Sequence, residues 1–176
     1  MKELILGGAR SGKSVMAEQR AQASGLELVY IATGQGGDSE MSDRIAHHRQ
    51  RRGEQWTLVE EPIMLAQVLQ EQASDQRCLL VDCLTLWLSN CMLADDTTTW
   101  AAQREALLAV LQTLPGHIIM VSNEVSMGLV AMEALSRQFV DQSGWLHQQL
   151  AQRCDRVTLS VAGLPHTLKG QAPITG

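Results

Sequence analysis

The sequence predicts a single α/β domain in which a mostly parallel sheet carries helices on both faces. Short, almost continuously apolar runs alternate along the chain with segments of helical periodicity, and buried parallel strands produce such runs. The chain has 176 residues, 45% of them hydrophobic, which suits one domain with a sizeable core. We place the domain at residues 1–169 and expect residues 170–176, which contain glycine, proline and small polar residues, to form a flexible tail.

The predicted strands are the apolar runs themselves. A strand covered on both faces needs apolar side chains at successive positions rather than at alternate ones. On this basis we assign strands, in chain order, to residues 4–6, 26–32, 56–59, 78–84, 117–122 and 156–162.

The segments between these runs have the periodicity of helices. We assign helices to residues 13–23, 39–52, 62–73, 99–113 and 132–153. We also expect Met120, Met127 and Met132 to pack in the interior. Since sheets of this kind bind ligands beyond the carboxyl ends of their strands, the polar residues that follow the strands are the candidates for a site.

Composition and charge exclude several classes of protein. The net charge of −5 gives no general reason to expect binding to nucleic acid, and no apolar run approaches the roughly 20 residues of a membrane span. The N-terminus enters a strand pattern directly, without the pattern of a secretory signal. The cysteines form no CxxC pair, which favours reduced thiols in a cytoplasmic protein; they are Cys78, Cys83, Cys91 and Cys154.

A phosphate-binding motif follows the first strand. Residues 7–14 have the Walker A pattern G-x-x-x-x-G-K-S, and they lie between a strand and a helix, as the motif requires. Glycines let the backbone curl until its N–H groups converge on an anion, and the helix N-terminus adds partial positive charge. Lys13 is expected to reach the β- and γ-phosphates, and the Ser14 hydroxyl to bind Mg²⁺. The nucleotide-binding residues of the motif are Gly7, Gly8, Ala9, Arg10, Ser11, Gly12, Lys13 and Ser14.

Asp82 follows the apolar run at 79–81. An acidic residue at the tip of a buried strand matches a Walker B carboxylate, which holds Mg²⁺ directly or through water. The alternative is a turn or helix-capping residue. We favour the metal role, because a carboxylate in an apolar run is costly unless it is paired or binds a metal.

The segment 43–52 is the most unusual in the chain, with the sequence DRIAHHRQRR. In a helix, His47 shares a face with Arg44 and Arg51, whereas His48 falls on the face turned toward the core. A neutral imidazole among guanidinium groups is suited to attack a phosphate and to form a phosphoramidate. The alternative is a solvated basic face with no chemistry.

Taken together, the motifs resemble one enzyme family. The chain is similar to the bifunctional adenosylcobinamide kinases / adenosylcobinamide-phosphate guanylyltransferases over nearly its whole length. The resemblance is carried by GGARSGKS, YIAT, DRIAHHRQRR, LLVDCLTLWLSN and SNEVSMG, which occur in the family's order at 7–14, 30–33, 43–52, 79–90 and 122–128.

The resemblance implies a P-loop NTPase fold and two reactions in coenzyme B12 biosynthesis. A nucleoside triphosphate, ATP or GTP, phosphorylates adenosylcobinamide; GMP then passes from GTP to a histidine, here His47, and on to adenosylcobinamide phosphate. Mg²⁺ and a homo-oligomer, a trimer in the best-known member, are implied as well. Further nucleotide contacts carried over from the family are Ile31, Ala32, Thr33, His48, Arg49, Gln50, Arg51, Glu61 and Asp82.

The sequence departs from the family's pattern in two places, at 126–131 and at 145–147, where Trp145 and His147 stand in place of arginine and asparagine. Both places concern substrate contacts rather than nucleotide motifs. The sequence leaves two other functions open, a P-loop kinase for another small hydroxyl substrate and a GTP-binding regulatory protein. The second would need an N-K-x-D motif, which this chain lacks. Asn123 and Glu124 are balanced between a role in the site and the capping of a turn.

Overall fold

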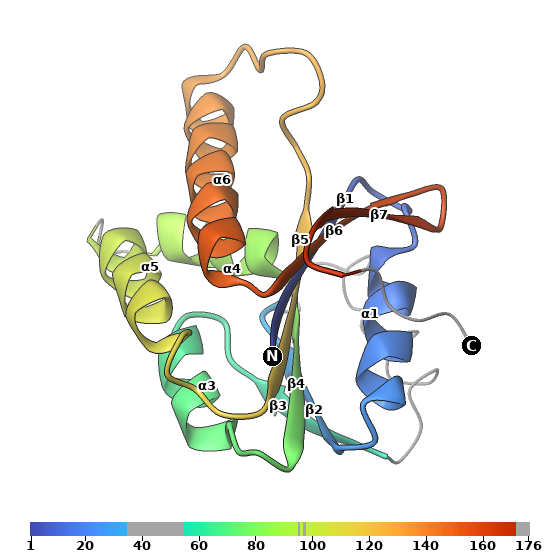
Figure 1. The fold of residues 1–176 in the computed structure, drawn as a ribbon. Helices are drawn as coiled ribbons and strands as arrows, with labels where there is room; N and C mark the ends of the chain where they lie inside the picture. Colours follow the sequence, from blue (N-terminus) through green and yellow to red (C-terminus); the bar gives the residue numbers. More distant parts are fainter. Residues whose placement is uncertain (35–54, 95, 97, 172–176) are drawn as a thin grey trace.

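The computed structural model describes residues 1–34, 55–94, 96 and 98–171. They form one seven-stranded sheet in the order β3-β2-β4-β5-β1-β6-β7. All neighbouring strands pair in parallel except β6 and β7, which are antiparallel. The prediction of a mostly parallel sheet is therefore confirmed (Figure 1).

The strands and helices alternate through most of the chain, as expected. In chain order the elements are β1 (Lys2–Gly7), α1 (Lys13–Ala23), β2 (Glu27–Ala32), β3 (Trp56–Glu60), α3 (Leu65–Gln72), β4 (Arg77–Asp82), α4 (Leu84–Met92), α5 (Thr99–Val110), β5 (His117–Asn123), α6 (Ala134–Arg153), β6 (Arg156–Val161) and β7 (Leu164–Lys169).

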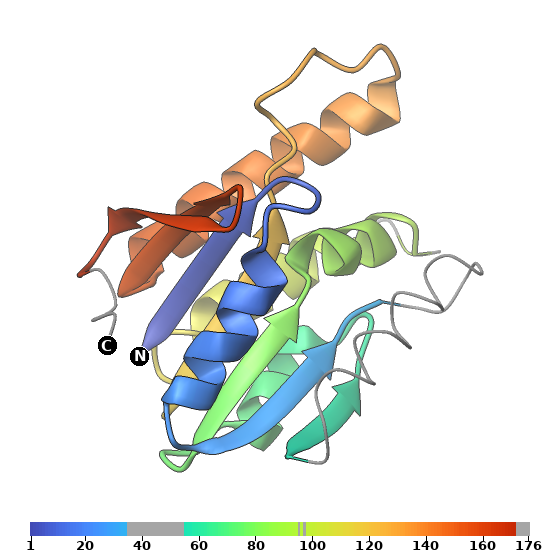
Figure 2. The ribbon, with the colours of Figure 1, turned by 90° about the vertical axis from the view of Figure 1, so that its right-hand side faces the viewer.

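Helices cover both faces of the sheet. On one face α1 packs against a core of strand residues such as Ile5, Tyr30 and Val121. On the other face, α3, α4, α5 and α6 enclose a larger core around Trp87. Figure 2 shows α1 lying in front of the strands, with the remaining helices behind them. The alternation of side chains along each strand thus supplies apolar contacts to both layers, which is why the strand sequences are apolar at successive positions.

Two strand assignments were wrong in detail, and each of them hid an element that the sequence did not indicate. The predicted strand 78–84 ends at Asp82, and residues from Leu84 onward form α4, a mostly apolar, buried helix without an exposed polar face. The strand predicted at 156–162 turns at Ala162 and Gly163, both with positive φ, into β7. That strand escaped detection because it lies mostly exposed at the sheet edge and needs no apolar run.

Some expectations about individual residues also changed. Met120 is buried as predicted, but Met127 and Met132 are 78% and 95% exposed, so their assignment to the interior was wrong. The four cysteines are free and buried, in agreement with reduced thiols. The predicted helix 39–52 lies outside the described residues, and so does most of the predicted tail. Within the described part of the chain, no helix combines the length and apolar character of a membrane span.

Candidate functional site

The phosphate loop lies between β1 and α1 at the carboxyl edge of the sheet (Figure 2). Arg10 and Gly12 have φ values of 56° and 90°, so the backbone makes the left-handed turns that let successive N–H groups face one side. The Ser11 N–H donates to Gly8 O at 3.3 Å and closes the turn. The Lys13 ammonium donates to the same carbonyl at 3.0 Å, which folds the lysine over its own loop.

The β6–β7 hairpin supports the loop from outside. Ser11 O accepts hydrogen bonds from Ser160 Oγ and from Gly163 N, both at 2.8 Å. A Cβ on Gly12 would come within 2.9 Å of Gly163 Cα, so the close approach of the two segments needs glycine at position 12. Sequence analysis missed this contact, because about 150 residues separate Ser11 from Ser160 and Gly163.

Lys13 and Asp82 lie close enough to interact electrostatically. Burial lowers the pKa of Lys13, while the charges of the Cys83 thiol and the Asp82 carboxyl group act in the opposite direction. Asp82 is in turn held by Tyr30, whose hydroxyl donates to Oδ2 at 2.6 Å. The Walker A lysine and the predicted Walker B carboxylate are therefore brought to one place, with Tyr30 as an additional residue that sequence analysis did not identify.

A polar network joins the ends of β2, β3 and β4. The buried Thr33 hydroxyl donates to Cys83 O at 2.8 Å and accepts from Cys83 N at 3.0 Å. The amide of Asn90, on α4, donates to Thr33 O at 2.7 Å and to Pro62 O at 3.2 Å. The network fixes the chain on both sides of Asp82, because each strand end is tied to its neighbour.

The other residues predicted to contact the nucleotide differ in their position and in their burial. Ala32 ends β2 at the same edge of the sheet as Asp82, with which it pairs in register. Ile31 is fully buried in the core, and its backbone lies between β3 and β4 within the sheet. Glu61 follows β3 and accepts from the N–H groups of Ile63 and Met64 at 2.8 Å, just before α3 begins. Its carboxylate therefore caps the start of α3, at the carboxyl end of β3.

The basic segment cannot be placed relative to this edge. His47, His48, Arg49, Gln50 and Arg51 lie outside the described residues. Among the residues that are described, no three His, Cys, Asp or Glu side chains gather as a metal cluster. A hydroxyl and a carboxylate nevertheless fit Mg²⁺, because this ion takes one or two protein oxygens and completes its shell with water and substrate phosphates. Ser14, in the first turn of α1, and Asp82 supply that donor set.

The hydrogen bonds at the end of β5 distinguish two residues, Asn123 and Glu124, whose roles the sequence left open. Both carboxylate oxygens of Glu124 accept from the Ser126 N–H, at 2.9 and 3.1 Å, so Glu124 caps the following turn. Asn123 instead reaches across to α4, where its Nδ2 donates to Thr85 Oγ1 at 3.0 Å. Of the pair, only Glu124 has the bonds of a turn-capping residue.

The two departures from the family pattern lie on α6 and on the loop before it. Trp145 is 52% exposed, whereas His147 points inward and its Nε2 lies 2.7 Å from the Ser122 hydroxyl. Burial lowers the pKa of His147 to about 4, so the imidazole is neutral at physiological pH. His147 thus fastens α6 to β5, a role that asparagine or histidine can fill by hydrogen bonding.

Comparison with known proteins agrees with the motifs. The family model described as cobinamide kinase / cobinamide phosphate guanyltransferase matches residues 3–168. The chain is 58% identical to the bifunctional adenosylcobalamin biosynthesis protein CobP of Pseudomonas aeruginosa, covering 97% of this chain and 99% of the relative. It is 37% identical to the protein CobU of Escherichia coli, over 96% of this chain and all of that one.

Solved structures share the fold at low sequence identity. The flagellar accessory protein FlaH of Methanocaldococcus jannaschii matches 97% of this chain and 78% of its own, with a TM-score of 0.51 and 12% identity. A Pyrococcus horikoshii protein from a structural study of project PH0250 matches 98% and 87%, with a TM-score of 0.52 and 8% identity. At such identities the likeness concerns the fold alone.

Proposed function

This chain belongs to the cobinamide kinase / cobinamide phosphate guanyltransferase family, and from that premise we propose how its residues divide the two reactions. It is a bifunctional enzyme of adenosylcobalamin biosynthesis that acts as cobinamide kinase and as cobinamide-phosphate guanylyltransferase. Membership of the family replaces the two alternative functions that the sequence left open, a kinase for another small molecule and a regulatory GTP-binding protein.

The phosphate loop is the proposed site of the nucleoside triphosphate, ATP or GTP in the kinase step and GTP in the guanylyl transfer. The observation that carries this proposal is the placement of Lys13, at the start of α1, and Asp82, at the end of β4, at one edge of the sheet beside the left-handed turns of the loop. Loop N–H groups and Lys13 would hold the β- and γ-phosphates, and Ser14 with Asp82 would hold Mg²⁺. When bound, the ion neutralises charge that develops on the phosphate oxygens.

His47 is the proposed acceptor of GMP. Its Nε2 or Nδ1 would attack the α-phosphorus of GTP, the bond to the β-phosphate oxygen would break, and pyrophosphate would leave with the electron pair. The phosphate of cobinamide phosphate would then displace the histidine from the phosphorus, which returns the imidazole to its neutral state. Support comes from Arg44 and Arg51, which share a helical face with His47 in the predicted helix and suit a phosphate.

We expect His47→Ala to abolish the labelling of the protein by [α-³²P]GTP with Mg²⁺, because no other residue is proposed to hold GMP. The label on the native protein should survive a denaturing gel and be lost in acid, as a phosphoramidate is. His166→Ala is the matched control, since this histidine lies exposed on the edge strand β7, outside the predicted nucleotide contacts, and the label should persist. Labelling of His47→Ala at the native level would exclude this histidine as the acceptor.

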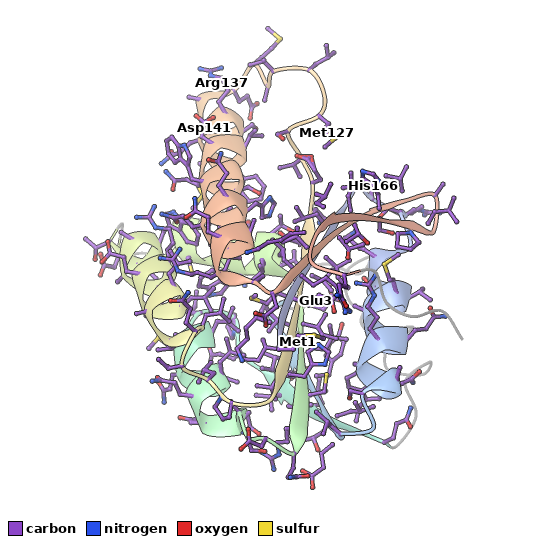
Figure 3. All side chains as sticks on the ribbon, in the orientation of Figure 1. Met1, Glu3, Met127, Arg137, Asp141 and His166 are labelled. Carbon is purple, nitrogen blue, oxygen red and sulfur yellow. The ribbon has the colours of Figure 1, made fainter. Side chains whose placement is uncertain are left out.

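We further propose that the chain acts in the cytoplasm as a homo-oligomer, a trimer by resemblance to the family. Its support is an exposed apolar loop at 125–132, in which Leu129 is fully exposed and Met127 stands well away from the sheet (Figure 3). Monomeric proteins rarely leave such a surface uncovered. Light scattering is expected to give three times the chain mass of 19.3 kDa, and a monomer at micromolar concentration with full activity would contradict the proposal.

A further inference from the structure

Strand β5 lies between the two strands that carry the nucleotide motifs. Its neighbours are β1, which leads into the phosphate loop, and β4, which ends at Asp82. In register, Asn123 pairs with Gly7, and Val121 pairs with Asp82. Asn123 therefore stands two residues beyond the level of Asp82, or about 6.6 Å further along the strand direction, toward the edge where ligands bind.

The Asn123 side chain is on the face of the sheet that α1 covers. Side chains two positions apart on a strand share a face, and Val121 packs in the same core as Met16 and Ala17 of α1. Lys13 begins that helix. Strand alternation thus puts the Asn123 side chain on the same face as the start of α1, and from there its Nδ2 reaches Thr85 in the first turn of α4.

Within the part of the chain that the structure describes, one hydrogen bond holds the Asn123 side chain in place and leaves part of its amide free for a contact with a ligand. Its Nδ2 donates to Thr85 Oγ1 at 3.0 Å, and this hydroxyl, which is buried, also lies 3.1 Å from Cys83 Sγ. The bond links β5 to the residues directly after Asp82. Among the described residues, neither the second Nδ2 hydrogen nor Oδ1 of Asn123 has a partner, although Asn123 is only partly exposed.

We propose that Asn123 is a further catalytic residue of the kinase reaction, in which its second Nδ2 hydrogen is donated to the γ-phosphate of the nucleotide. In this step the acceptor hydroxyl oxygen forms a bond to the γ-phosphorus while the bond to the β–γ bridging oxygen breaks. The nucleoside diphosphate leaves with that electron pair, and the hydroxyl proton is released to water. Asn123 stays neutral throughout and stabilises the charge on the transferred phosphoryl oxygens.

The two reactions of the enzyme should depend on Asn123 unequally. In the kinase step the γ-phosphoryl group is the one that moves, so a contact to it strengthens as the transition state forms. In the attack of histidine on GTP the reacting phosphorus is the α-phosphorus, and the γ-phosphate remains part of the leaving pyrophosphate. Loss of the contact is therefore expected to weaken the kinase step more than the formation of the GMP adduct.

The test measures steady-state phosphorylation of cobinamide by ATP with full-length Asn123→Ala and Asn123→Asp, alongside GMP labelling of the same proteins. We expect the kinase kcat of Asn123→Ala to fall about 100-fold, with the KM for ATP within threefold of native. Asn123→Asp should fall at least as far, since its carboxylate repels the phosphate. Thr113→Ala, exposed just after α5 and outside the nucleotide motifs, is the control and should keep native kinetics.

A folded Asn123→Ala protein whose kinase kcat stays within threefold of native would overturn the proposal, and so would a loss confined to the KM for cobinamide. If Asn123→Ala fails to fold, Thr85→Val decides instead: without its hydroxyl anchor Asn123 is less well placed, and kcat should fall about tenfold at constant KM for ATP. An unchanged kcat in Thr85→Val would then reject the assignment. The kinase assay does not involve His47, so failure of native protein to take up GMP would bear on the histidine proposal alone.

Discussion

Replacing Lys13 with alanine should remove both reactions at once. The structure describes a single phosphate loop among residues 1–34, 55–94, 96 and 98–171, and the Lys13 ammonium folds over it onto Gly8 O. Without the ammonium group, the β- and γ-phosphates lose the charge that holds them and that offsets the charge of the transition state. We expect the kinase rate and the rate of GMP labelling each to fall by about 10²- to 10³-fold.

The measurement for Lys13→Ala pairs the two activity assays with a thermal unfolding curve. The fold should be retained, because the ammonium group makes a single hydrogen bond to the described residues, the one to Gly8 O. Removal of a buried cation from the loop is not expected to lower the melting temperature, since burial already disfavours the charged form. Lys169→Ala, at the exposed edge strand β7, controls for the loss of a lysine elsewhere.

Loss of one of the two activities without the other would contradict this prediction. If Lys13→Ala lost the kinase activity but kept native GMP labelling, then the guanylyl transfer would use a second nucleotide site. With that outcome, the effects of Asn123 variants on the kinase step and on GMP labelling could not be compared at one site, because the two reactions would no longer share a phosphate loop.

Replacing Glu3 with glutamine is expected to cause the largest loss of stability. Glu3 lies on β1 with no exposed surface (Figure 3). It forms ion pairs with Arg20 of α1 and with Arg156 of β6, the latter with 3.6 Å between the charged atoms. Arg20 also donates to Thr158 Oγ1 at 3.0 Å. Glutamine keeps the shape of the side chain but leaves two mostly buried guanidinium groups without their shared anion.

The cost follows from desolvation. Breaking a buried ion pair by removing one partner typically costs about 3–5 kcal/mol, because an uncompensated charge stays out of water. His117 cannot compensate for the change. It lies 3.8 Å from Glu3, and burial lowers its pKa to about 4, so it is neutral at pH 7. For a domain of this size the loss corresponds to a melting temperature lower by about 10 °C.

Chemical denaturation and thermal unfolding of Glu3→Gln measure this effect. Glu27→Gln is the matched control: Glu27 pairs with Arg77 at 3.1 Å, but its side chain is 70% exposed, so the pair should contribute less than about 1 kcal/mol. Equal, small losses in both variants would show that the Glu3 cluster contributes no more than a surface pair.

Most of the fold could be predicted from the sequence because its signals are local. Strands β1, β2, β4 and β5 are buried on both faces, which favours apolar residues at successive positions in the middle of each strand. Helix α4 was missed for the converse reason: around Trp87 it is buried on nearly all sides, so it lacks the polar face by which a helix is recognised.

The candidate site was predictable to the extent that its chemistry lies in contiguous motifs. Lys13 and Ser14 belong to one eight-residue pattern, and Asp82 stands at the end of an apolar run. Tyr30 was not predicted, because a tyrosine inside an apolar strand reads as a core residue until its hydroxyl is seen to reach Asp82. The positions of His47 and its arginines relative to the loop remain predictions from sequence and resemblance.

The sequence by itself determined the fold class, the phosphate loop and the family, since each depends on the spacing of residues within short segments. Only the tertiary structure showed which partners the equivocal residues bond to. Asn123 and Glu124 are neighbours with similar turn-forming tendencies, yet Glu124 bonds to its own turn and Asn123 bonds to Thr85. The physical reason is the parallel sheet: it aligns the ends of strands that are far apart in the chain, so a partner such as Thr85 is adjacent in space and invisible in the local sequence.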